Sequence, residues 1–243
     1  MKSTYFHKIS VGCCLLALIV TANAALAQGR QNRGGRNQRG GSQFVPAATQ
    51  APQLSTTQVK LLLEMQQEEK LAHDVYVALG KSSGIPIFKN ISAAESQHMQ
   101  AIHWLLGKVP PEYTQAEGKF AIDKFQTLYE ELVKAGSSSQ LAAVMVGAKI
   151  EELDIKDLQT LLATEQPSAV RQVLENLQRG SRNHLRAFAA QISSLGGNYS
   201  AEFLSQTEFD QIAASPTERG GGAGKNGGQA GKSAGRRGRN RQK

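Results

Sequence analysis

Residues 91–106 have the sequence ISAAESQHMQAIHWLL. Apolar side chains recur every three or four positions along this stretch, from Ile91 through Ile102, which predicts an amphipathic helix. Ser92 and Glu95 stand three residues apart and fit a capping box, so we expect this helix to begin near Ser92. Glu95 and His98 interrupt the apolar stripe, which makes them candidate functional residues.

Working outward, the same spacing predicts three more long helices, over residues 57–79, 138–163 and 167–195. Shorter helices are expected at 124–135 and 207–214, and Pro167 fits a first helical turn. Short loops join the first pair and the last pair of long helices, whereas about 30 residues separate the two pairs. Since aromatic residues make up only 6% of the chain and no β-type alternation is evident, we expect an all-α four-helix bundle with one long crossover.

Each predicted long helix carries a carboxylate or an imidazole on its apolar stripe. These residues are Glu69, Glu95 with His98, Glu152, and His184. Uncompensated carboxylates are costly in a dry core, and a bound metal would explain several of them at one depth. The bland alternative is a bundle held together by internal ion pairs, in which Arg182 or Arg186 neutralises Glu152 or Glu69.

The ends of the chain differ in composition from its middle. Residues 1–27 have Lys2 and Lys8, a short apolar run and a small-residue cleavage site at 25–27, as in a secretory signal peptide. Both cysteines lie in this segment, so the mature chain would contain no thiolate ligand and no disulfide. It would also contain no transmembrane segment, and we expect an exported protein, periplasmic or extracellular.

Two basic arms are expected to flank the bundle at residues 55–215. The arms, 28–54 and 216–243, are rich in Gly and Arg, with Gln in the first and Lys in the second, and this composition is typical of disorder. Residues 28–50 and 219–243 together carry twelve basic residues and no acid, whereas residues 51–218 have a net charge of −6. Such arms can bind a polyanion, such as a nucleic acid, a polysaccharide or an envelope lipid, or they can serve as solubilising tails.

The predicted bundle resembles a known superfamily. The first-helix pattern of Glu69, Ala72 and Tyr76 is similar to that of rubrerythrin and bacterioferritin relatives in the ferritin-like superfamily of carboxylate-bridged di-metal bundles. The stretches EEKLA (68–72), PIFKNI (86–91), EELDI (151–155) and RGSRNHLRAF (179–188) look closest to an uncharacterised bacterial ferritin-like domain family of exported proteins. The likeness covers about residues 55–215.

The resemblance implies a two-iron site that oxidises ferrous iron or reduces peroxide, with O₂ or peroxide as the small substrate, although manganese or zinc would also suit the ligands. It implies Glu69, Glu95, His98, Glu152 and His184 as ligands and Tyr76 as a neighbour of the site. The superfamily pattern has a second E-x-x-H, but Ser181 stands three residues before His184. Glu151 or Asp154 could supply the missing group, and Glu151 is also the alternative to Glu152 as the ligand of its helix. A single-metal site stays an alternative.

Two hypotheses follow for function. In the first, the protein is an exported metal-binding protein, with di-iron oxidoreductase activity of the ferroxidase or peroxidase type as one form. In the second, the bundle is a non-catalytic scaffold whose arms bind polyanions or the cell surface. The absence of cysteine in the mature chain excludes electron delivery through a rubredoxin-like module.

Overall fold

The computed structural model describes residues 52–220, and within them every regular element is helical. The elements are α1 (Thr56–Ser83), α2 (Ile87–Leu106), the short 3₁₀ helix η1 (Pro111–Tyr113), α3 (Asp123–Gly136), α4 (Gln140–Leu162), α5 (Ser168–Ser194) and α6 (Gln206–Ala214). The all-α prediction is therefore confirmed. The predicted signal peptide and nearly all of both arms lie outside the described residues. No helix within residues 52–220 combines the length and apolar character needed to cross a membrane.

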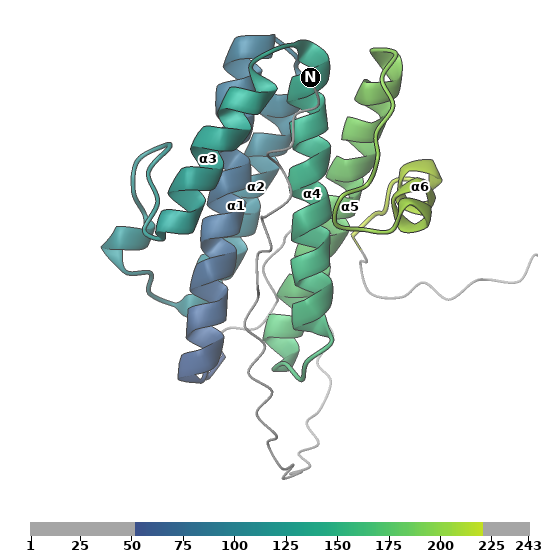
Figure 1. The fold of residues 1–243 in the computed structure, drawn as a ribbon. Helices are drawn as coiled ribbons and strands as arrows, with labels where there is room; N and C mark the ends of the chain where they lie inside the picture. The colour runs from purple at the N-terminus through teal and green to yellow at the C-terminus, as the bar shows by residue number, and fades with distance from the viewer. Residues whose placement is uncertain (1–51, 221–243) are drawn as a thin grey trace, which may run out of the picture.

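The four long helices form two antiparallel hairpins that pack against each other. Helices α1 and α2 make one hairpin, and α4 and α5 make the other (Figure 1). Residues 107–139 form the long connection between the hairpins, as the spacing predicts. Within that connection α3 packs against both α1 and α4, so it covers the seam between the two hairpins on one side of the bundle.

Local sequence explains most of the helix ends. The Ser55 hydroxyl accepts a hydrogen bond from the backbone N–H of Gln58 in a complete capping box at the start of α1. Gly84 ends α1 with φ 70°, a left-handed conformation that favours glycine. The capping box predicted at Ser92 is wrong, because α2 begins five residues earlier and the Ser92 hydroxyl donates to the Lys89 carbonyl. Glu95 therefore lies inside α2 and does not cap it.

The core has a polar layer between two apolar clusters. One cluster contains an aromatic group, Tyr76, Phe88 and Phe188, whose ring centroids lie 5.3–5.9 Å apart. The other contains leucines and valines of α1, α2 and α5, including Leu62 and Leu177. Along α1, α2 and α5 the polar residues of the predicted site fall between these clusters. Both ends of the polar layer are therefore closed to water by packed apolar side chains.

Polar side chains of α1 anchor the crossover. The Gln67 side chain accepts from the Ala121 N–H at 2.9 Å and donates to the Tyr113 carbonyl at 3.2 Å. Asp74 accepts from the Gly118 N–H at 2.9 Å. Because these bonds pin both ends of the loop against α1, they set where α3 begins and hence how it covers the seam.

Candidate metal centre

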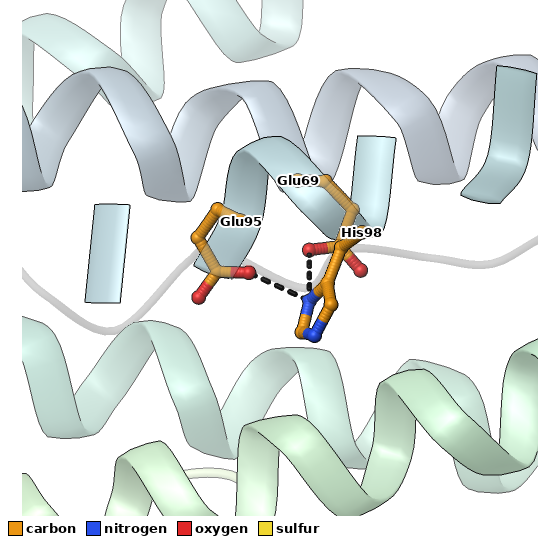
Figure 2. A group of neighbouring side chains, drawn as sticks. All are labelled: Glu69, Glu95 and His98. Carbon is orange, nitrogen blue, oxygen red and sulfur yellow. Dashed lines mark hydrogen bonds and ion pairs between the residues drawn. The ribbon is translucent and has the colours of Figure 1, made fainter. Parts of the chain in front are cut away.

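The first group of ligand atoms joins α1 to α2. The Nδ1 atom of His98 lies 2.7 Å from Oε2 of Glu95 and 3.0 Å from Oε2 of Glu69. Figure 2 shows both carboxylates turned toward this one ring nitrogen. All three side chains are at most 2% exposed. The three residues predicted from the first two helices thus form one compact buried group.

The second group joins α2 to α4 and α5. The Nδ1 atom of His184 lies 2.8 Å from Oε1 of Glu95 and 3.5 Å from Oε2 of Glu151. The Tyr76 hydroxyl donates a hydrogen bond to the other oxygen of Glu151 at 2.6 Å. Tyr76 therefore holds one oxygen of Glu151 and leaves the other directed at His184.

Glu95 belongs to both groups and gives one oxygen to each. Oε2 faces His98 and Oε1 faces His184, and the two imidazole rings stack with centroids 5.6 Å apart. Each group offers three ligand atoms that all lie within 4.8 Å of one another. A carboxylate placed in this way can bridge two cations, one in each group.

The residue predicted from α4 lies elsewhere. Oε2 of Glu152 accepts hydrogen bonds from the backbone N–H groups of Glu202 and Phe203, each at 2.8 Å. Glu152 is fully buried, but it is buried under the segment that links α5 to α6 and not in the polar layer between the hairpins. Its neighbour Glu151, the alternative considered from the sequence, stands in the polar layer instead.

Ser181, which stands where the superfamily pattern has a second carboxylate, contacts Asp154. The Ser181 hydroxyl donates a short hydrogen bond to Oδ2 of Asp154, across from α5 to α4. Oδ1 of Asp154 is buried and accepts no hydrogen bond from residues 52–220. Burial, together with the nearby charges of Glu69 and Glu151, raises the pKa of Asp154 well above its usual range. Asp154 thus flanks the two groups but does not belong to either.

A glycine makes room for His98. A β-carbon added at Gly180 of α5 would lie 2.5 Å from the Nε2 atom of the His98 ring, closer than real contacts allow. The imidazole of α2 therefore fits under the backbone of α5 only because residue 180 has no side chain. The sequence places Gly180 on the inward face of its helix but does not reveal which ring it admits.

Burial and neighbouring charges favour retained protons on Glu69, Glu151 and His184 but not on Glu95. Burial raises the pKa of Glu69 to about 8 despite the neighbouring His98, and burial also raises the pKa of Glu151. Burial alone would raise the pKa of Glu95, but His184 and His98 outweigh it and hold that pKa below its usual range. Burial opposes protonation of His184, yet Glu95 and Glu151 raise its pKa to about 10. A cation entering the site would displace these protons.

The residues present fit a pair of transition-metal ions. The donor set of carboxylates and imidazoles without thiolates suits iron or manganese and also accommodates zinc. Oε1 of Glu69 is buried and accepts no hydrogen bond from residues 52–220, as is true of Oδ1 of Asp154. Buried acceptors without donors are costly, and a cation would satisfy them.

A small cavity opens beside the centre. It lies among α1, α3 and α4, and its volume of about 30 Å³ accommodates one or two water-sized molecules. The site carboxylates Glu69, Glu95 and Glu151 line its inner end, and Phe125, Leu128 and Leu132 of α3 line its outer wall. Molecules that reach the centre by this path must therefore be very small.

Comparison with known proteins assigns the chain to a family. It belongs to the family of uncharacterised protein domains DUF2202, whose model matches residues 58–216. A relative is the uncharacterised protein MJ0754 of Methanocaldococcus jannaschii, which is 43% identical over 162 residues, 65% of this chain and 88% of the relative. The crystal structure of hypothetical protein MJ0754 superimposes with a TM-score of 0.67 at 39% identity, and the match covers 71% of this chain and 100% of that one. The resemblance to the ferritin-like superfamily stays a prediction.

Proposed function

We propose that this protein binds two divalent transition-metal ions, iron or manganese in preference to zinc, in the polar layer of the bundle. Glu69 and His98 hold one ion, Glu151 and His184 hold the other, and Glu95 bridges them. The observation that carries the proposal is the division of the Glu95 carboxylate, with one oxygen 2.7 Å from His98 Nδ1 and the other 2.8 Å from His184 Nδ1. A single-metal site would leave one of these groups without a role.

Internal ion pairs account for the buried charge less well. The two arginines that could neutralise the site carboxylates turn to another partner. Arg182 Nη2 and Arg186 Nη2 both contact the Glu218 carboxylate, the latter at 2.6 Å. Their hydrogen bonds and charges lower the pKa of Glu218 to about 2, although burial acts in the opposite direction. The polar-layer carboxylates Glu69, Glu95 and Glu151 instead contact His98 and His184.

We further propose that the centre oxidises ferrous iron or reduces peroxide, as the ferritin-like resemblance implies. A bound pair of redox-active ions supplies the electrons for such chemistry. The residues of the chain bind the ions, exclude bulk water through the two apolar clusters, and fix Glu151 through Tyr76. The small cavity supports O₂ or peroxide and disfavours an organic substrate of ordinary size.

Anaerobic loading of the full chain with ferrous iron, followed by one equivalent of peroxide, tests this activity. Two ferrous ions and two protons reduce one peroxide to two water molecules, so we expect both ions to become ferric in a single fast phase. Glu152→Gln serves as a control, since Glu152 faces the α5–α6 segment. Bound ferrous iron that reacts no faster than iron in buffer would refute the proposed activity but not the metal site.

For the two ends of the chain we propose export and polyanion binding. The support is the signal-like segment at 1–27 and the twelve basic residues of 28–50 and 219–243, which are free of acids. Binding of the arms to heparin should weaken steeply with salt, and residues 51–218 alone should not bind. Equal retention of the two forms on a heparin column would refute a role for the arms.

A further inference from the structure

The cavity beside the centre connects buried ligands to partly exposed side chains. Its inner lining includes Glu69 and Glu95, which are 2% exposed, whereas Glu68, Leu128 and Leu153 on its outer side are only partly buried. Apolar clusters pack above and below the polar layer, and Glu152 with its hydrogen-bonded segment covers the far side of α4.

Carboxylates continue outward from the cavity along both helices that border it. On α1, Glu68 follows Glu64 by one helical turn, and on α4, Asp157 follows Asp154 by one turn. Glu68 of α1 and Asp154 of α4 both line the cavity, so the acids of the two helices meet there. The seam between α1 and α4 is thus acidic from the surface inward.

A lysine at the start of α3 stands over this seam. Lys124, at the start of α3, lies with its Nζ atom 3.4 Å from Oε1 of Glu64, and its charge also acts on Glu68 and Asp157. Its side chain is 44% exposed, so it can move aside or be displaced. Because α3 lies across the seam (Figure 1), Lys124 sits where the acids reach the surface.

An acidic seam alone does not indicate a bound cation. The buried oxygen atoms at the inner end of this seam do indicate one. Glu69 is 2% exposed, lines the cavity, and keeps its Oε1 atom without a hydrogen-bond donor among residues 52–220. Asp154 also lines the cavity, and its Oδ1 atom likewise accepts no hydrogen bond from residues 52–220. The cavity therefore leads to buried oxygen atoms that accept no hydrogen bond from residues 52–220.

We propose that divalent cations reach the metal centre through this cavity, that Glu68 is the first carboxylate to bind them, that Asp154 receives them next, and that Lys124 slows their uptake. This inference rests on the proposed metal site. Glu68 acts on the rate of uptake and not on the number of ions held, because its side chain belongs to neither ligand group.

The test measures the rate and the extent of uptake separately. Metal-free full-length protein is mixed with Co²⁺ in a stopped-flow instrument, and the visible absorption of the bound ion is followed. The Co²⁺ content at equilibrium is then measured after dialysis. Glu68→Gln should slow uptake roughly tenfold, and Lys124→Gln should accelerate it several-fold, since charges near an entrance act mainly on association rates. Both variants should reach the wild-type content.

Glu165→Gln is the matched control, since Glu165 is an exposed acid between α4 and α5 that does not line the cavity. Its uptake rate should equal that of the wild type. The inference is overturned if Glu68→Gln takes up Co²⁺ at the wild-type rate, if it holds less Co²⁺ at equilibrium, or if Glu165→Gln is slowed to the same degree. Wild-type protein that binds no Co²⁺ would instead overturn the proposed metal site, and the inference with it.

Discussion

The metal-free protein should lose stability as the pH rises from 5 to 8. In the folded protein Glu69 titrates with a pKa of about 8, against an ordinary value of 4.5. Between these values the folded state holds a proton that the unfolded state has released, so each unit of pH lowers the free energy of unfolding by about 1.4 kcal/mol. His184, raised from 6.5 to about 10, acts in the same direction above pH 6.5.

For Glu69 alone the loss amounts to about 4 kcal/mol over three pH units, or about 10 °C in Tm for a folded region of this size. Thermal melting followed by circular dichroism, in chelator and with bound metal, measures this effect. Glu69→Gln cannot titrate, so its metal-free Tm should depend less on pH. With metal bound, the trend should reverse, because the ions compete with protons for the same atoms. A metal-free Tm that is constant or rises between pH 5 and 8 would refute the reasoning.

Three further substitutions test individual contacts. Gly180→Ala should force the His98 ring to move and weaken metal binding at least tenfold in a chelator competition while leaving the helical content intact; unchanged affinity would show that the ring position does not matter. Tyr76→Phe should lower the free energy of unfolding of the metal-free protein by about 1–2 kcal/mol in urea, through the lost hydrogen bond to Glu151, and an unchanged value would contradict this. Glu151→Gln should lower the metal content from two ions to one, whereas Glu152→Gln should keep both; the opposite pattern would reverse the assignment of the two residues.

The helical bundle could be predicted from the sequence because its signals are local and repeated. Apolar spacing of three and four residues and the glycines at helix ends are read directly from the chain, and Gly84 ends α1 as such glycines usually do. The beginning of α2 could not be read in this way. Ser92 followed by Glu95 fits a capping box, but the helix starts at Ile87. Glu95 instead contacts His184 of α5.

The choice between Glu151 and Glu152 shows where reasoning from periodicity ends. Both side chains are at most 2% exposed, because α4 is covered on two sides, by α1 and α3 on one side and by α5 with the following segment on the other. An apolar stripe identifies a buried residue but not which neighbour buries it. The contact between Tyr76 and Glu151 depends on residues 75 positions apart, and the capping of Glu152 by backbone N–H groups depends on a segment 50 residues away.

The central claim is that Glu95 bridges two ions, and the metal content of Glu95→Gln tests it most directly. Full-length wild type, Glu95→Gln and Glu152→Gln are loaded with excess Mn²⁺ or with anaerobic Fe²⁺, dialysed, and analysed by mass spectrometry for metal per chain. We predict two ions in the wild type and in Glu152→Gln. For Glu95→Gln we predict loss of both ions with the helical spectrum retained, since one carboxylate serves both groups. Two ions bound to Glu95→Gln, or none bound to the wild type, would contradict the claim.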